Sequence, residues 1–239
     1  MSSTEIGTKT AAQANPQEKV KFVERVNAFM HTNRKVFLFL VIAVLVGVVG
    51  LGVYSAISSN LVVKSTIALD SLETSYKEFS SLEDAEKTTK SVDLITGADV
   101  LIAKYGKRYA AVRASMIKAE ILFALNDVAA AEKLFAATAD LYPKSHLAPV
   151  ALANAAGIAE DRGDFDLALT YLNKVESAYP VAPGIGHIKL SIGRIYETTK
   201  LYDKALETYT KLVATGVESD WTKIAHDRII LMKSQGLVK

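Results

Sequence analysis

Cysteine is absent from the 239 residues, which excludes structural disulfides, thiol catalysis, iron–sulfur clusters and cysteine-rich zinc sites. Net charge is almost absent as well, because 28 Lys and Arg residues face 26 Asp and Glu residues. The chain therefore has no broad basic field for nucleic-acid phosphates, and we expect no nucleic-acid partner. Half of the residues are hydrophobic, which excludes disorder throughout and leaves packing alone to hold the fold together.

Recognisable catalytic motifs are missing too. The sequence has no HExxH helix, no GxSxG elbow and no glycine-rich phosphate loop between a strand and a helix. Its histidines never pair at the i, i+3 or i, i+4 spacing of a helical metal site; they are His31, His146, His187 and His226. We therefore expect a protein that is not an enzyme, with no catalytic residue, cofactor, metal or small-molecule substrate.

One acidic run leaves two interpretations open. Residues 160–166 (EDRGDFD) carry several carboxylates, which hard cations such as calcium prefer as ligands. Their spacing differs from that of an EF-hand loop, and a turn that ends one helix and begins the next explains the same residues. We favour the turn.

A stretch without any ionisable group runs from Val36 to Val63. Its first 22 residues, VFLFLVIAVLVGVVGLGVYSAI, have the length that a helix needs to cross the hydrocarbon core of a bilayer. A buried helix of a soluble protein keeps a polar stripe, and this segment has none. The sequence therefore predicts one N-terminal transmembrane helix over residues 36–58.

The charges that flank this segment predict its orientation. Arg34 and Lys35 directly precede it, whereas Lys64 is the only nearby cation that follows it. The positive-inside rule then puts the N-terminus in the cytoplasm and the C-terminal domain outside it. Because 35 residues precede a full-length span, we interpret the segment as an uncleaved signal anchor, in a bacterial inner membrane with a periplasmic C-terminal domain.

Small residues in the span would let a second helix approach closely. Ala43 with Gly47, and Gly52 with Ala56, form two small-xxx-small pairs. Oligomers through the transmembrane helix are therefore one interpretation. Ordinary helix composition is the other, and we favour it.

The residues before the span fall into two parts. Residues 1–17 are polar and lack aromatics, which predicts a disordered cytoplasmic tail. Residues 18–35 alternate apolar and basic positions at helical spacing, which predicts a basic amphipathic juxtamembrane helix. This helix is either a docking site for a cytoplasmic partner or an interfacial lead-in to the span, and we favour the lead-in.

The second half of the chain contains an internal repeat of 37 residues. Three segments superpose at this shift, namely 126–143, 163–180 and 200–217. A second amphipathic stretch precedes each of them, so the repeating unit is a helix hairpin. The turn of the hairpin is clearest where Gly163 suits a left-handed position and Asp164 can cap the following helix, and Asn126 with Asp127 fits the same roles one repeat earlier.

Alanine recurs once in each copy, at Ala131, Ala168 and Ala205. We expect the two helices of a hairpin to pack most closely there, because a larger side chain would push them apart. Aligned aromatic and leucine residues flank these alanines, and the first two copies end in Tyr-Pro; the positions concerned are Phe135, Leu172, Tyr209, Pro143 and Pro180.

These residues resemble the tetratricopeptide repeat, whose pattern asks for small residues in the first helix, Gly at the turn, and then an aromatic, an Ala, an aromatic and a closing Pro. The middle copy matches best, whereas the third has Val217 in place of Pro and the period is 37 rather than 34 residues. The resemblance implies an α-solenoid of stacked hairpins that binds protein partners.

Other segments complete the predicted all-α fold. Residues 59–106 are expected to form lead helices, the first of them continuous over 61–90, before three tetratricopeptide-like repeats at 107–217. Residues 218–239 are expected to form a C-terminal capping helix that covers the last repeat.

Stacked hairpins create a groove along the first helices of the repeats, and a groove of mixed character suits a peptide or a partner helix. By position in the repeat, the predicted groove residues are Arg113, Met116, Glu120, Phe123, Val150, Ala153, Glu160, His187, Leu190, Arg194 and Glu197.

The whole arrangement of tail, span, lead helix and hairpins resembles the YfgM-type ancillary subunits of the bacterial Sec translocon. Membership would imply a periplasmic interaction domain near the Sec channel that works with periplasmic chaperones on emerging proteins. The alternative is a structural or assembly scaffold of the cell envelope or of a membrane-embedded machine. The periplasmic repeat proteins with linkers like residues 142–153 are usually lipoproteins or soluble, and the chain has no cysteine to lipidate.

Overall fold

The computed structural model describes residues 16–239, with side chains from Glu24 onward. This part of the chain forms ten helices and no strand, which confirms the all-α prediction. It divides into two compact units, Met1–Asn60 and Leu61–Lys239. The predicted disordered tail lies outside the described residues except for its last two positions, which begin the first helix.

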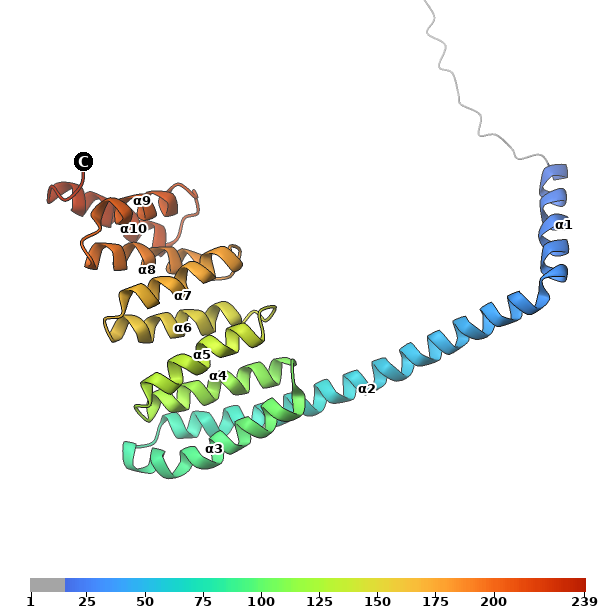
Figure 1. The fold of residues 1–239 in the computed structure, drawn as a ribbon, viewed down its shortest axis with the longest axis horizontal. Helices are drawn as coiled ribbons and strands as arrows, with labels where there is room; N and C mark the ends of the chain where they lie inside the picture. The colour runs from blue at the N-terminus through green and yellow to red at the C-terminus, as the bar shows by residue number, and fades with distance from the viewer. Residues whose placement is uncertain (1–15) are drawn as a thin grey trace, which may run out of the picture. The chain divides into compact units, whose positions relative to one another are not determined.

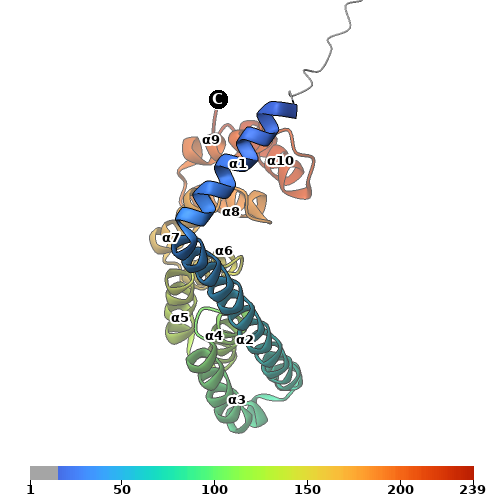
Figure 2. The ribbon, with the colours of Figure 1, turned by 90° about the vertical axis from the view of Figure 1, so that its right-hand side faces the viewer.

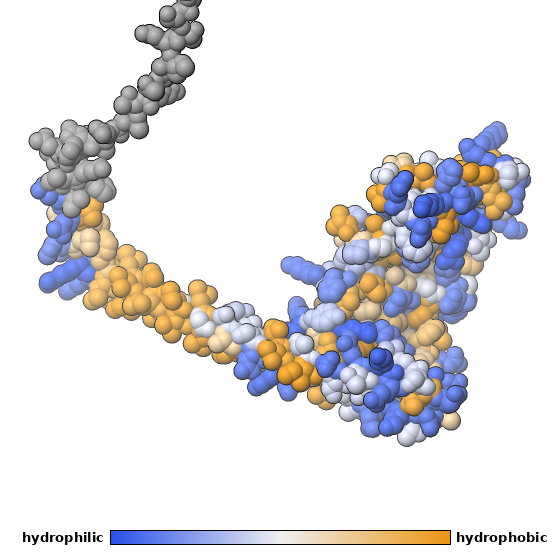
Figure 3. All heavy atoms as spheres, turned by 180° about the vertical axis from the view of Figure 1, so that it is seen from behind, coloured by the Kyte–Doolittle hydropathy of each residue, from blue (hydrophilic) through white to orange (hydrophobic). Residues whose placement is uncertain are grey.

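The first unit contains α1 (Pro16–Thr32) and the N-terminal part of α2 (Arg34–Ser80). Proline suits the first position of α1 because its missing N–H would have no helical partner there. The most apolar 18-residue window of α2 has a mean hydropathy of 3.1, and none of it is buried by the rest of the protein. This apolar surface is continuous along the helix (Figure 3), so α2 is long and apolar enough to cross a membrane.

The second unit is a stack of antiparallel helix hairpins (Figures 1 and 2). The end of α2 precedes the remaining eight helices, which are α3 (Asp84–Tyr105), α4 (Tyr109–Ala124), α5 (Val128–Leu141), α6 (Ala148–Asp161), α7 (Phe165–Ala178), α8 (Ile185–Thr198), α9 (Tyr202–Val213) and α10 (Asp220–Ser234). From α3 onward, each helix packs on the next in chain order. This nearest-neighbour packing is the arrangement of a solenoid.

The predicted turns within the hairpins are confirmed. Asn126 and Gly163 adopt left-handed backbone conformations, with φ of 64° and 80°. The next residue caps the second helix in both cases, because the carboxylates of Asp127 and Asp164 accept hydrogen bonds from backbone N–H groups three residues on. In the third hairpin Lys200 takes the left-handed position with φ of 61°, and Leu201 provides no side-chain cap.

The aligned alanines are fully buried where the helices of each hairpin meet. Ala131, Ala168 and Ala205 all have 0% exposure, as the repeat predicts. In the third hairpin the contact is tighter still, because a Cβ atom at Gly193 would overlap the ring of Tyr209. Alanine and glycine at these positions therefore set the distance between the two helices of each hairpin.

The expectation of one continuous helix over 61–90 is wrong, because α2 ends at Ser80 and α3 begins at Asp84. The hydroxyls of Ser80 and Ser81 donate to the carbonyls of Tyr76 and Glu78, which closes the last turn of α2. Acidic residues in the first turn of α3 then favour a new helix start. The end of α2 and α3 thus form a further hairpin ahead of the three repeats.

Three buried clusters run along the stack. The first joins α2, α3 and α4, the second joins α4 to α8, and the third joins α8, α9 and α10. In the third cluster Ala225 and Met232 of α10 are fully buried against the last hairpin. The start of α10 is held by a capping box between Ser219 and Thr222.

Candidate functional site

A cleft of about 500 Å³ lies on the second unit where α2, α4 and α6 come together. Its lining residues are Tyr76, Phe79, Ser80, Lys87, Glu120, Phe123, Ala124, Phe135, Ala153, Asn154, Gly157, Ile158 and Asp161. We refer to this set as the α2–α4–α6 cleft. These helices precede the turn of their hairpins, so the cleft lies on the face where the repeat pattern predicts a groove.

The cleft offers an aromatic and an amide group to a ligand. The ring of Phe123 is 47% exposed, and no atom lies within 4 Å of the position that a Cβ atom would occupy at Gly157. Asn154 is half-buried on the same helix as Gly157, and its amide can both donate and accept hydrogen bonds. Apolar depth with a few polar groups is the usual composition of a recognition pocket.

Glu120 links the cleft to an ion-pair network between helices. The Arg113 Nη1 atom lies 2.8 Å from Glu120 Oε1, and Arg113 Nε lies 3.0 Å from Glu73 Oε1 of α2. Burial, followed by the charge of Glu120, raises the pKa of Tyr76. The Tyr76 hydroxyl therefore stays neutral at physiological pH.

Three of the eleven predicted groove residues line the cleft, namely Glu120, Phe123 and Ala153. Four more form ion pairs between successive hairpins rather than open binding positions. Besides the Arg113 pairs, Arg194 of α8 binds Glu160 of α6, and Arg228 of α10 binds Glu197 of α8 with Nε 3.0 Å from Oε2. The carboxylate of Glu197 also accepts a hydrogen bond from Tyr209 Oη at 3.1 Å.

These ion pairs align the helices of this face. Each pair has a carboxylate or guanidinium that is largely buried, so removal of one partner would leave the other charge without compensation. Their effect is mainly positional: they fix neighbouring hairpins and satisfy the charges of the predicted groove internally.

Two predicted groove residues are core residues. Met116 is 2% exposed and packs in the second buried cluster, and Leu190 is 9% exposed and packs in the third. Repeat position alone predicts their exposure wrongly, because an apolar side chain at the edge of a helix face can pack against the neighbouring helix instead of facing the groove. Of the two that remain, Val150 is exposed outside the cleft, and the ring of His187 lies 4.7 Å from that of Trp221.

The part of the cleft that α2 supplies is not among the predicted groove residues, because the sequence predicts residues 61–80 as a lead helix and not as the first helix of a hairpin. Asn154 and Gly157 are not among the predicted residues either. Gly157 could have been found, since the 37-residue shift aligns it with Glu120 and Arg194.

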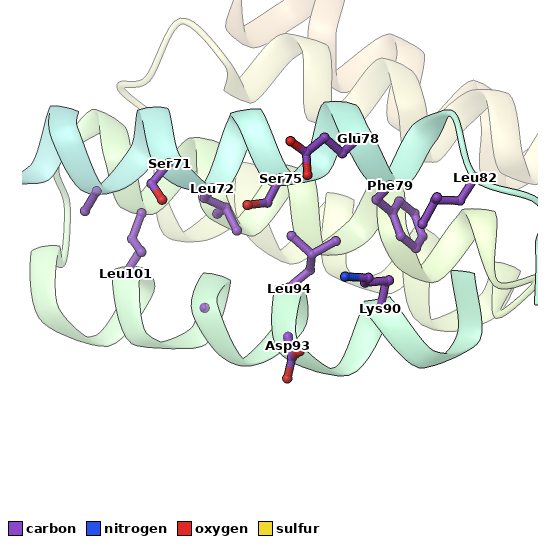
Figure 4. A pocket seen from close by; sticks show the side chains of 12 residues that line it. Ser71, Leu72, Ser75, Glu78, Phe79, Leu82, Lys90, Asp93, Leu94 and Leu101 are labelled. Atoms are coloured by element: carbon purple, nitrogen blue, oxygen red, sulfur yellow. The ribbon is translucent and has the colours of Figure 1, made fainter. Parts of the chain in front are cut away.

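A second cleft of about 470 Å³ separates α2 from α3 (Figure 4). Leu72, Leu94 and Leu101 point into it, while Ser71, Ser75 and Lys90 border it. Several of its lining residues belong to the first buried cluster, so this cleft is an opening over the core between two loosely spaced helices.

The stacked hairpins and the cleft define the class of protein: an α-solenoid of the kind that is typically a non-catalytic scaffold for protein–protein interactions. The sequence profile of the tetratricopeptide repeat-like domain family matches residues 27–225, and the chain belongs to this family.

Solved structures support the same fold. Two crystal structures of nearly identical TPR-like repeats, from a Podosopora anserina protein assigned as a kinesin light chain, superpose with TM-scores of 0.51 and 0.52. They are 12% and 10% identical, and each alignment covers 70% of this chain and 88% of the other, which indicates a shared fold. No curated protein sequence matches the chain significantly.

Proposed function

We propose that the chain is a single-pass membrane protein whose second unit binds segments of client proteins outside the cytoplasm, assisting Sec-dependent translocation or handover to periplasmic chaperones. The α2–α4–α6 cleft is the observation that carries this proposal. Its exposed Phe123 ring and the open space over Gly157 suit an apolar client side chain, and the Asn154 amide suits a peptide backbone.

The membrane anchor would keep this cleft near the membrane surface. The apolar window of α2 has the length to span a bilayer, and the cations beside its start favour a cytoplasmic N-terminus. A domain tethered to the membrane raises the local concentration of its binding surface for segments that emerge there. The likeness to ancillary translocon subunits supports the same assignment.

Topology has a direct test because the chain has no cysteine. We expect a membrane-impermeant thiol reagent to label a Ser177→Cys variant in intact spheroplasts and to leave a Ser3→Cys variant unlabelled. The reverse labelling would overturn the proposed orientation.

Partner identity is tested by in-cell photocrosslinking. A photoreactive residue replaces Phe123 in the cleft, with a matched probe at the exposed Thr170 on α7 as the control. Secretory chains, translocon subunits or periplasmic chaperones captured from position 123 alone would support the proposal. Capture of one stable envelope or motor protein would favour the structural scaffold instead, and equal capture from both probes would exclude the cleft.

A further inference from the structure

The connections between successive hairpins lie at one end of the second unit, the end at which α2 enters it (Figure 1). They comprise residues 106–108, 142–147 and 179–184, together with the helix ends Tyr105 and Tyr109 that flank the first of them. The Tyr105 hydroxyl donates to the backbone carbonyl of Lys64 at 3.3 Å, which holds the first connection beside α2.

Two further contacts join the connections to one another. The ring of Tyr109 stacks on that of His146 at 5.4 Å, and the Tyr179 hydroxyl donates to the Pro143 carbonyl at 3.0 Å. The three connections therefore form one continuous surface, which we call the connection edge.

The connection edge is basic. It carries cations from α2, from the end of α3 and from the first two connections, and among the described residues none of them takes part in an ion pair: Lys64, Lys104, Lys107, Arg108 and Lys144. The neighbouring carboxylates of Asp99 and Asp140 are already paired with Lys118 and Lys174. The positive charge of this edge is thus uncompensated.

Lys107 and Lys144 are 37 residues apart, so they occupy equivalent positions in successive repeats. Together with Tyr109, Tyr142 and His146 they line a hollow of about 550 Å³. Two ammonium groups and two tyrosines around one hollow are suitable for a phosphodiester, which ammonium and hydroxyl donors bind by charge-assisted hydrogen bonds.

Apolar side chains accompany these cations at the same edge. Val181 in the third connection is 92% exposed, and Leu141 and the ring of Tyr109 are also exposed. Tyrosines, lysines and single apolar side chains are found together on protein surfaces that lie at a membrane–water interface.

The chain keeps this edge close to the bilayer if α2 spans it. Ile57 ends the apolar stretch, and Lys64 follows seven residues later. Seven residues extend about 10 Å as helix and about 24 Å when fully stretched. Because α2 is helical throughout this stretch, Lys64 lies about 10 Å along the helix from the end of the apolar segment, and the Tyr105 hydroxyl bonded to its carbonyl joins the first connection to the same point.

We propose that the connection edge binds the phosphodiester headgroups of anionic lipids in the leaflet from which α2 emerges. This inference rests on the proposed membrane crossing by α2, but not on the identity of any client. Docking of this edge would direct the second unit toward the membrane surface and define its position next to the proteins it serves.

Hydrogen exchange of the full-length chain in nanodiscs tests the proposal. We expect amides in residues 105–109 and 142–147 to exchange at least about fivefold more slowly in phosphatidylglycerol nanodiscs than in phosphatidylcholine nanodiscs, since fivefold is the factor typical of one lysine at an anionic surface. Lys107→Glu combined with Lys144→Glu should abolish the difference. The matched control, Lys90→Glu with Lys133→Glu, makes the same charge change at exposed lysines elsewhere and should retain it.

Equal exchange in the two lipids, or slowing that survives in the Lys107→Glu/Lys144→Glu variant, would overturn the proposal. Slowing in phosphatidylcholine nanodiscs on addition of soluble glycerol phosphate would reassign the hollow to a free phosphate compound. Failure of the chain to enter nanodiscs would overturn the crossing by α2 and the lipid assignment together, whereas failure to capture clients from position 123 would leave the lipid assignment intact.

Discussion

Residue 200 carries an avoidable strain. The three hairpin turns place Asn126, Gly163 and Lys200 at equivalent left-handed positions, with φ of 64°, 80° and 61°. Asparagine and glycine adopt this conformation readily, whereas a side chain such as that of lysine costs about 1 kcal/mol or more there. The third hairpin thus starts its second helix from the least favourable turn.

Replacing Lys200 by glycine should therefore stabilise the second unit. We expect Lys200→Gly to raise the free energy of unfolding by about 1 kcal/mol, the usual gain from relieving a left-handed residue. Lys204→Gly, within α9, is the matched control and should lower it by about 1 kcal/mol. Denaturant unfolding followed by circular dichroism measures both, and destabilisation by Lys200→Gly would contradict the assigned turn.

Gly193 and Tyr209 form a size-matched pair. The preceding repeats hold Ala119 with Phe135 and Ala156 with Leu172 at the equivalent positions, so the smallest partner accompanies tyrosine in the third. A methyl group at Gly193 would overlap the Tyr209 ring, which is itself 1% exposed and has no space to yield.

We expect Gly193→Ala to destabilise the protein by about 1 to 3 kcal/mol. Combining it with Tyr209→Leu recreates the Ala–Leu pair of the second repeat. The loss of unfolding free energy in the double variant should therefore be about 1 kcal/mol smaller than the sum of the losses in the two single variants. A double-mutant cycle gives this coupling, and strict additivity would disprove the size matching.

At the scale of the elements, the hairpin interface depends on its alanines. Ala168 of α7 is fully buried against α6 and packs in the second buried cluster with Leu152 and Leu172. The interior is close-packed, so no neighbouring cavity can take a large ring. Overpacking here must separate the two helices.

Ala168→Trp is therefore expected to cost about 3 kcal/mol or more and to abolish the cooperative melting of the second unit. Thr170→Trp puts the same ring on the exposed side of the same helix and should leave the melting temperature nearly unchanged. Thermal melting by circular dichroism compares the two. An unchanged curve for Ala168→Trp would mean that the helix register is wrong.

Sequence patterns predicted those parts of the fold that depend on a few adjacent residues. The 37-residue shift predicted the buried alanines and the turns at Asn126 and Gly163, because backbone conformation and helix capping depend on a few adjacent residues. The break after Ser80 was missed, since no glycine or proline marks it. The left-handed turn at Lys200 was missed because no glycine or asparagine marks it, although the N–H groups of Lys200 and Leu201 donate to the carbonyls of Glu197 and Tyr196 in the same local pattern as in the other two turns.

The candidate site was harder to predict for a related reason. A repeat assigns positions to a face but not the depth to which a side chain sinks, so Met116 and Leu190 are buried and Arg194 is paired with Glu160. The cleft itself depends on α2, which the repeat pattern does not include. It needs the packing of three helices that are distant in sequence.

Across the whole molecule, the apolar part of α2 is followed directly by the helix hairpins of the tetratricopeptide repeat-like domain. The family match over residues 27–225 includes both the apolar part of α2 and the repeats, so the two occur together in a single domain pattern. We propose that this molecule works by holding protein segments in the α2–α4–α6 cleft.

A side chain that fills the cleft from within should prevent client binding there. Gly157 is exposed on its floor, and no atom lies within 4 Å of the place that a methyl group would take there, so Gly157→Trp should occupy the space without disturbing the core, and Gly157→Ala is the matched control. We predict that photocrosslinking from position 123 falls about tenfold or more in Gly157→Trp, equivalent to about 1.4 kcal/mol of binding free energy, and persists in Gly157→Ala at the same melting temperature. Undiminished capture by Gly157→Trp would mean that clients do not bind in the α2–α4–α6 cleft.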